Sequence, residues 1–283
     1  SQKLYGRENE INELLAYYNN HHRSQSILVL VAGYSGVGKS ALIRHIKFPI
    51  IQNKGTFLSG KFDQFKKDIP YYAFIEAIRE FIKNLLSEPE VKMDFWRERI
   101  LNVLGENAGL ITEVIPQLST IIGKQPLVTV LQPAEQETRF HMVLLDFIYA
   151  FSTYENQLVI FLDDLQRADL PSLNLVLRIL ENPKKYNILI RGAYRDNEVE
   201  KGHHLLITLK QINEFHGHLK EIKLQPLNLE TTCKITADSF GMNETQANEL
   251  GNHIFTKTKG NPFFIHSFLK SLYDKKLVTK KTW

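Results

Sequence analysis

The chain has 283 residues, of which 43% are apolar and 23% are charged, as in an ordinary soluble globular protein with a full hydrophobic core. A net charge of +4 is too small to predict a nucleic acid or an acidic membrane as a partner, and Cys233, the only cysteine, excludes an internal disulfide. No apolar run is long enough to cross a bilayer, so we expect a cytoplasmic protein.

The first quarter of the chain predicts two helices and two strands. A polar helix is expected from Glu8 to Tyr18. The apolar run at 27–32 predicts a buried strand, because it is short, rich in β-branched residues and followed by glycine. A helix is expected from Lys39 to about Lys47, and a second strand at 56–61.

Residues from about 71 to 152 predict several helices, because apolar side chains recur there at helical spacing. We interpret these stripes as core rather than as a cofactor site. The side chains that mark them are Ala73, Phe74, Ala77, Ile78, Phe81 and Ile82, then Phe95, Ile100 and Val103, then Ile111, Val114, Leu118 and Ile121 or Ile122, and lastly Phe140, Leu144, Phe147 and Phe151.

Three further strands are predicted at 158–163, 188–194 and 221–224. Strands that alternate with helices predict an α/β fold whose parallel sheet is covered on both faces. After residue 225 the pattern becomes purely helical as far as about 273, so we expect a subdomain boundary near 225.

The segment 33–40 reads Gly-Tyr-Ser-Gly-Val-Gly-Lys-Ser and matches the pattern of a phosphate-binding loop. Its glycines allow the backbone to curl so that N–H groups face phosphate oxygens, and the following helix adds its positive dipole end. Lys39 is expected to reach the β- and γ-phosphates, and Ser40 to ligate Mg²⁺. A ligand-free glycine turn is the weaker alternative, because a strand precedes the motif and a helix follows it. The residues expected to contact a nucleotide here are Gly33, Ser35, Gly36, Val37, Gly38, Lys39, Ser40 and Ala41.

An acidic pair ends the strand at 158–163. We assign Asp163 to the metal, held through its waters, and Asp164 to orienting the attacking water. Arg195 follows the next strand, and there either it touches the γ-phosphate or it forms an ion pair with Asp196 or Glu198. The candidate catalytic residues are therefore Lys39, Asp164 and Arg195.

These motifs together resemble the STAND class of signalling ATPases, within the wider AAA-like P-loop ATPases. More narrowly, they resemble the central ATPase module of multisensor serine/threonine and hybrid histidine kinases. The resemblance covers nearly all of the chain. The segments that carry it are 4–10, 33–40, 60–65, 69–71, 161–166, 193–198 and 257–264.

The resemblance implies a P-loop NTPase fold, with a five-stranded parallel sheet of strand order 5-1-4-3-2 and a large helical insertion. It divides the chain into an ATPase core at 1–225, a helical lid at 226–275, and the start of a truncated winged-helix-like domain at 276–283. The chain would then be one piece of a larger signalling protein, with ATP or ADP and Mg²⁺ as ligands and with ATP-dependent self-association.

The resemblance also places residues around the base. Tyr5, Gly6 and Arg7 would lie beside the adenine and ribose, and Pro262 of the lid would pack on the base. The chain departs from the branch in two places. Arg167 stands where a tryptophan is common, and Asp164 stands where vigorous AAA-type ATPases have a glutamate, which implies slow hydrolysis.

The function that these features favour is a nucleotide switch that alternates between ADP and ATP states. A continuously cycling ATPase is an alternative, and it needs an arginine in trans, for which Arg167 and Arg191 are candidates by residue type. A nucleotide-independent scaffold is a second alternative. A small-molecule kinase and an origin-binding ATPase are disfavoured, the first because no acceptor site is readable and the second because the charge is modest.

Overall fold

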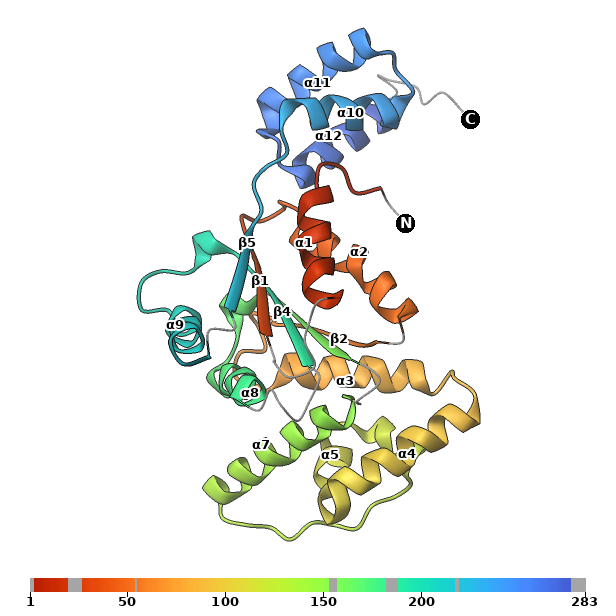
Figure 1. Cartoon of the computed structure of the whole chain (residues 1–283), viewed down its shortest axis with the longest axis vertical. Helices are drawn as coiled ribbons and strands as arrows, with labels where there is room; N and C mark the ends of the chain where they lie inside the picture. Colours follow the sequence, from red (N-terminus) through yellow and green to blue (C-terminus); the bar gives the residue numbers. More distant parts are fainter. Residues whose placement is uncertain are drawn as a thin grey trace.

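A five-stranded parallel sheet forms the centre of the computed structural model, which describes residues 3–19, 27–53, 55–152, 157–181, 188–216 and 219–275 (Figure 1). The strands run side by side in the order β2-β3-β4-β1-β5, which confirms the predicted order 5-1-4-3-2 read from the opposite edge. Their bounds are β1 Ile27–Ala32, β2 Thr56–Lys61, β3 Leu158–Asp163, β4 Ile188–Tyr194 and β5 Leu219–Lys223.

The register of the sheet brings the predicted site residues to the end of the sheet at which the strands finish. Ala32 at the end of β1 lies opposite Tyr194 of β4, and Lys61 of β2 lies opposite Asp163 of β3. All four strand pairs are parallel, so the segments that follow the strands emerge at the same end of the sheet.

Helices cover both faces of the sheet and leave two buried clusters. On one face, α1 (Glu8–Asn19) and α2 (Lys39–Gln52) pack on the alternate side chains of β1 that include Val29 and Val31. On the other face, α3 (Tyr72–Leu85), α8 (Leu170–Glu181) and α9 (His204–His216) pack on the opposite set, which includes Leu28 and Leu30. Alternate burial on two faces is what a covered parallel strand requires.

The helical insertion lies between β2 and β3 and extends beyond one end of the sheet (Figure 1). We use this name for α3 to α7. Its later helices share one hydrophobic cluster with α3, α8 and the sheet, which makes the insertion part of the main body. The bounds are α4 Glu90–Leu104, α5 Ala108–Val114, α6 Ser119–Ile122 and α7 Pro133–Ala150.

Three C-terminal helices stand at the opposite end of the molecule (Figure 1). They are α10 (Leu229–Phe240), α11 (Glu244–Thr258) and α12 (Pro262–Asp274), and we call them the C-terminal bundle. The bundle has a small apolar cluster of its own, built around Ile254 and Ile265. The segment 276–283, expected to begin a winged-helix-like domain, lies outside the described residues.

The element boundaries differ from the sequence predictions in three places. Helix α2 continues past Lys47 to Gln52, with Pro49 inside its last turn, because Ile46 and Ile50 are both fully buried there. The helix expected over 111–122 is divided into α5, a 3₁₀ turn that begins at Pro116, and α6, since Ile115 has the non-helical backbone (φ −125°, ψ 77°) that the residue before a proline favours. Strand β5 begins at 219 rather than 221.

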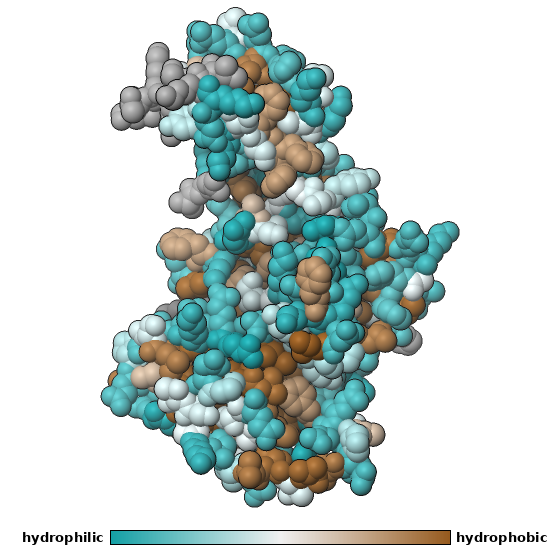
Figure 2. All heavy atoms as spheres, turned by 180° about the vertical axis from the view of Figure 1, so that it is seen from behind, coloured by the Kyte–Doolittle hydropathy of each residue, from teal (hydrophilic) through white to brown (hydrophobic). Residues whose placement is uncertain are grey.

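The surface is mainly hydrophilic, but apolar side chains gather in the lower half of the molecule when it is seen from behind (Figure 2). The exposed apolar side chains of the structure include Leu127 and Val130, in the segment between α6 and α7, and Phe95 of α4, which the stripe pattern assigns to the core. Over the described residues, no helix combines the length and the apolar character that a membrane span needs.

Candidate nucleotide-binding site

The loop between β1 and α2 depends on glycine for its backbone conformation. Gly33, Gly36 and Gly38 have φ angles of 148°, 78° and 105°, and residues with a Cβ rarely adopt such backbone conformations. A Cβ added at Gly38 would meet no atom within 4 Å, so the space beside the start of α2 is open. These features give the loop the shape of a phosphate cradle at a helix N-terminus.

Lys39 is the first residue of α2 and is 7% exposed. Its ammonium donates hydrogen bonds to the carbonyl oxygens of Gly33 at 2.6 Å and Tyr34 at 2.9 Å. Burial and the nearby charge of Arg195 lower the pKa of the Lys39 ammonium, against the opposing charge of Asp163. A phosphate in the cradle offers this ammonium a charged partner in place of two carbonyls.

Ser40 and Asp163 lie in contact at the end of β3. The Ser40 hydroxyl donates to Asp163 Oδ2 at 2.8 Å, although 123 residues separate the two. Mg²⁺ prefers oxygen ligands and usually takes only one or two from protein when phosphates and water supply the rest. The pair fits that donor set. No cluster of three or more His, Cys, Asp or Glu that could hold a metal by itself occurs among the described residues.

Asp164 sits at the centre of a charged cluster. It is 4% exposed and has a positive φ of 54°. Its carboxylate accepts a hydrogen bond from Gln166 Nε2 at 3.1 Å and forms ion pairs with Lys61 Nζ at 3.3 Å and Arg195 Nε at 3.5 Å. Burial raises the pKa of Asp164, but the Gln166 hydrogen bond and the charges of Lys61 and Arg195 outweigh it, so the pKa lies below its ordinary value.

Arg195 makes one of the two ion pairs proposed for it from the sequence. Its guanidinium pairs with Glu198, whereas Asp196 pairs with Lys223 at 2.9 Å. Its backbone N–H also donates to the Gln166 side-chain oxygen at 3.2 Å. The second contact of Arg195, with Asp164, puts the guanidinium beside the acidic pair that follows β3.

Two members of this cluster were not assigned a role from the sequence: Lys61 and Gln166. Lys61 reaches Asp164 only because β2 lies next to β3, and Gln166 also donates to Glu198 at 3.3 Å because the β3 and β4 ends are adjacent. In the sequence, Lys61 lies at the end of a strand and Gln166 just after one, within the segments 60–65 and 161–166 that carry the family resemblance, but their contacts with Asp164 follow only once the strand order is known.

Arg7 connects the phosphate loop to the segment between β5 and the C-terminal bundle. Its guanidinium is buried and donates to the carbonyl oxygens of Val37 at 3.0 Å and Gln225 at 2.7 Å, and it pairs with Glu10 at 3.1 Å. Arg7 therefore holds two backbone segments around the site through Nη2, while Nη1 pairs with Glu10.

The residues beside Arg7 reach the C-terminal bundle directly. Tyr5 donates its hydroxyl to Asp238 of α10 at 2.8 Å. Gly6 has a φ of 61°, and a Cβ there would lie 3.0 Å from the Thr231 side chain of α10. The opening segment is thus packed between the core and the bundle.

A cavity of about 700 Å³ lies where the opening segment, the phosphate loop and the C-terminal bundle meet. Its size and its largely apolar wall, with a few polar groups, suit the aromatic base of a nucleotide. Six predicted residues line it: Tyr5, Arg7, Val37, Gly38, Ala41 and Pro262. Ser239 and His266 also line it and had no recognisable motif in the sequence.

The first turn of α12 touches the phosphate loop. The Asn261 amide donates to the Ser35 carbonyl oxygen at 3.0 Å, and the Phe263 N–H donates to the Gly36 carbonyl oxygen at 3.2 Å. A Cβ at Gly36 would lie 2.8 Å from atoms of both Asn261 and Phe263, so glycine is needed here for close approach as well.

The match to known families agrees with this site. Residues 3–190, about two thirds of the chain, match the family model described as an AAA ATPase domain. The chain belongs to the AAA ATPase domain family. It is therefore a P-loop ATPase module, as the phosphate cradle and sheet order indicate.

Curated relatives of this AAA ATPase domain are histidine kinases. Hybrid signal transduction histidine kinase G of Dictyostelium discoideum is 30% identical over 98% of the chain, which covers 10% of that protein. Histidine protein kinase 1 of Candida albicans is 22% identical over 84% of the chain, and peroxide stress-activated histidine kinase mak3 of Schizosaccharomyces pombe is 20% identical over 89%. The chain spans about a tenth of the length of these relatives.

Among solved structures, Cdc6p from Pyrobaculum aerophilum has a similar fold. The TM-score is 0.56, and the match covers 98% of this chain and 64% of that one at 13% identity. Identity this low shows a shared fold and carries no statement about partners.

The two arginines considered for a role in trans have different surroundings in this AAA ATPase domain. Arg191 is fully buried in β4, where it donates to the Leu14 carbonyl oxygen at 2.8 Å, and burial lowers its pKa to about 10. It does not fit a role that requires reaching a neighbouring molecule. Arg167 is partly exposed and lies 4.0 Å from Glu198.

Proposed function

We propose that this AAA ATPase domain is a nucleotide switch that binds ATP or ADP, hydrolyses ATP slowly with Mg²⁺, and regulates a larger signalling chain. The observation that carries the proposal is the direct bonding of the C-terminal bundle to the phosphate loop, through Asn261 and Phe263. A ligand shifts an equilibrium between two conformations only if it interacts differently with each. The loop proposed to face the phosphates is also the loop that holds the bundle, which supports a link between the bound nucleotide and the position of the bundle.

The chain's own residues divide the work of holding the nucleotide. Lys39 and the N-terminus of α2 hold the β- and γ-phosphates, and Ser40 with Asp163 holds Mg²⁺, which offsets phosphate charge when it is bound. The adenine lies in the cavity between core and bundle, beside Tyr5 and against Pro262. In this proposal the lid is residues 226–275, which contain the C-terminal bundle.

Slow hydrolysis follows from the surroundings of Asp164. We assign Asp164 to orienting the attacking water, but its carboxylate is already bonded to Lys61, Gln166 and Arg195. A lowered pKa also makes it a weaker proton acceptor. Arg195 is near enough to Lys39 to influence its pKa, which supports a contact with the γ-phosphate.

The wider role rests on the relatives. All three are histidine kinases, and the chain matches about a tenth of each. We propose that the module acts in the cytoplasm within a chain of that kind, and that the ATP state favours self-association.

The test begins with the nucleotide that purifies with the protein. We expect that denaturing the purified chain and separating the released small molecules will yield ADP at close to one per chain. Hydrogen exchange over 257–270 should then slow with ADP and accelerate with ATP and Mg²⁺, while a Lys39→Ala variant should need about thirtyfold more of either nucleotide for the same response. Equal exchange in the two nucleotide states, in a protein that binds both, would reject the switch and favour the cycling alternative.

A further inference from the structure

Gln166 lies in a short turn that is held against the neighbouring strand. The turn is a 3₁₀ helix, Leu165–Arg167, and it directly follows the acidic pair at the end of β3. Leu165 is buried against Gly192 of β4, where an added Cβ would lie 2.2 Å from the Leu165 side chain, so glycine allows this close packing. The packing brings Gln166, which is 5% exposed, beside the segment that follows β4.

The Gln166 amide forms hydrogen bonds at both of its ends. Its oxygen accepts from the Arg195 N–H at 3.2 Å, and its nitrogen donates to Asp164 Oδ1 at 3.1 Å and to Glu198 Oε2 at 3.3 Å. The reverse orientation would place the amide oxygen against two carboxylates and the amide nitrogen against an N–H, so the neighbours fix the orientation. Both carboxylates also pair with the Arg195 guanidinium. Gln166 and Arg195 therefore bridge the same two carboxylates, and the four residues form a closed ring.

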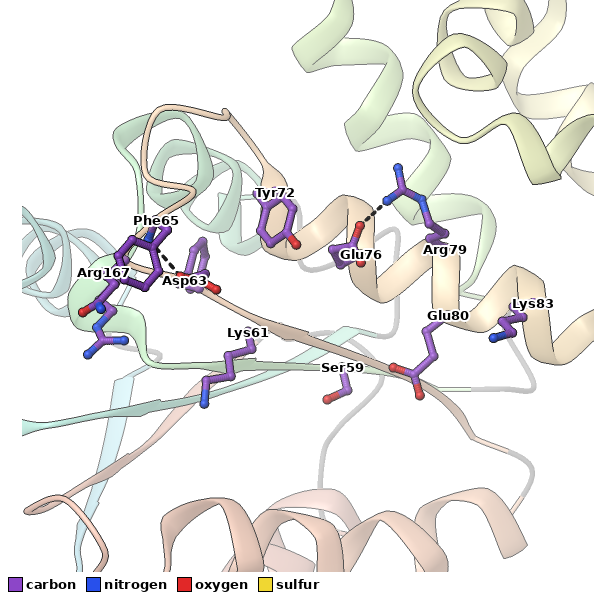
Figure 3. A pocket seen from close by; sticks show the side chains of 12 residues that line it. Ser59, Lys61, Asp63, Phe65, Tyr72, Glu76, Arg79, Glu80, Lys83 and Arg167 are labelled. Carbon is purple, nitrogen blue, oxygen red and sulfur yellow. Dashed lines mark hydrogen bonds and ion pairs between the residues drawn. The ribbon is translucent and has the colours of Figure 1, made fainter.

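The other side chains around Asp164 are more exposed than Gln166. Arg167, the next residue of the turn, is only partly buried, and with Lys61 it lines a cavity of about 770 Å³ (Figure 3). The Lys61 and Arg195 side chains, which both pair with Asp164, are 65% and 25% exposed. A buried amide with all its hydrogen-bonding ends in use is held more rigidly than these long, partly solvated side chains. Gln166 is therefore the partner best suited to fix the position of the Asp164 carboxylate.

We propose that Gln166 is a positioning residue for ATP hydrolysis, which holds Asp164 in place relative to Arg195 without touching the nucleotide. The inference rests on the roles proposed above for Asp164 with the attacking water and Arg195 with the γ-phosphate. Water and phosphate must be presented to each other in one geometry, and a displacement of about 1 Å can cost about a hundredfold in rate. One amide bonded to both residues meets that demand, because it links the end of β3 to the end of β4 at the place where the two groups act.

Gln166→Met tests this role, because methionine keeps the length of the side chain and removes all three hydrogen bonds. The Arg195 N–H loses its acceptor, so its hydrogen exchange in nucleotide-free protein should accelerate about fivefold, which reports the bond without any turnover. Single-turnover hydrolysis at saturating ATP and Mg²⁺ should slow about tenfold or more, while the Kd for ADP stays within about twofold. Gln211→Met, at an exposed glutamine of α9, is the control and should change none of the three.

A double variant shows whether Gln166 acts through Asp164. In an Asp164→Asn background, Gln166→Met should slow hydrolysis by less than about threefold, because little is left for the amide to position. If Gln166→Met fails to fold, Gln166→Asn provides the same comparisons. Its side chain is polar like that of glutamine, but it is shorter by one carbon–carbon bond, about 1.5 Å, so the amide cannot reach both partners.

The outcomes separate this inference from the proposed function. If Asp164→Asn hydrolyses ATP slowly but Gln166→Met keeps the wild-type rate, the positioning role is overturned and the role of Asp164 stands. Effects of the two substitutions that multiply in full would also overturn it, because Gln166 would then act independently of Asp164. If Asp164→Asn itself keeps the wild-type rate, the role proposed for Asp164 fails, and the positioning role fails with it.

Discussion

The helical insertion and the C-terminal bundle are both helical, but they are attached to the sheet in different ways. The insertion shares one continuous hydrophobic cluster with the sheet, in which Phe147 and Phe151 are fully buried and their ring centroids lie 5.0 Å apart. The bundle has a separate small cluster and meets the core through polar contacts, such as those of Asn261 with the phosphate loop and Tyr5 with Asp238.

This difference indicates which part of the molecule can move. Displacing the insertion would expose buried aromatic surface, at a cost of several kcal/mol. Displacing the bundle exchanges a few hydrogen bonds for bonds to water, each with a net value of about 1 kcal/mol. Nucleotide-driven motion is therefore expected in the bundle and not in the insertion.

The largest effect is expected from Phe147→Ala in the insertion. Truncating a fully buried phenylalanine costs about 3–5 kcal/mol of unfolding free energy. Because the insertion and the sheet share one hydrophobic cluster, both should be destabilised. Urea unfolding followed by Trp96 fluorescence, in a Trp283→Phe background, measures it. The control is Ile254→Ala in the bundle, which is also fully buried. The comparison fails if the control shifts the Trp96 midpoint as much as Phe147→Ala does.

A second variant concerns Asp164, the site residue that directly follows strand β3. Asp164→Asn should slow single-turnover ATP hydrolysis at least about a hundredfold, the lower range for a residue in proton transfer, while the Kd for ATP stays within about twofold. Quenched-flow measurement with radiolabelled ATP gives the rate. Glu200→Gln, an exposed carboxylate change, is the control. Equal rates in Asp164→Asn and the wild type would remove Asp164 from the reaction.

Much of the body was predictable from the sequence because its signals are local. The strands at 27–32, 56–61, 158–163 and 188–194 have the predicted bounds, since each is a short apolar or β-branched run bounded by turn residues. The phosphate loop was predictable for the same reason, because all of its glycines lie within six residues.

What the sequence did not reveal depends on neighbours in space. Lys61 pairs with Asp164 across 103 positions of the chain, as their numbers show, and only the β2–β3 pairing brings them together. Asn261 was part of a recognised motif, but its hydrogen bond to Ser35 depends on how the bundle docks. Arg191 had no signal that it would be buried, because an arginine within an apolar strand reads as exposed on residue type alone.

A third variant tests the phosphate loop as a holder of nucleotide. Lys39→Ala removes a charge-assisted contact to phosphate, so the Kd values for ATP and for ADP should both rise about thirtyfold, or about 2 kcal/mol. Isothermal titration calorimetry on nucleotide-free protein gives both values. The matched control is Lys210→Ala on the exposed face of α9, where the lysine pairs with Glu214. Unchanged affinities in Lys39→Ala would contradict the role given to the ammonium.

The smallest effect is expected from Asn261→Ser, and it addresses the docking of the bundle most directly. Serine still caps the first turn of α12, as Asn261 does by accepting from Phe263 N–H, but it lacks the amide that donates to Ser35. Loss of one hydrogen bond, about 1 kcal/mol, should increase hydrogen exchange at the start of α12 about fivefold, with no change in the Trp96 midpoint. Asn228→Ser is the control, because Asn228 caps α10 in the same way, by accepting from Thr231 N–H. If both variants exchange alike, the Asn261–Ser35 bond contributes no docking energy, and the bundle is held by the Phe263–Gly36 bond and by Tyr5 instead.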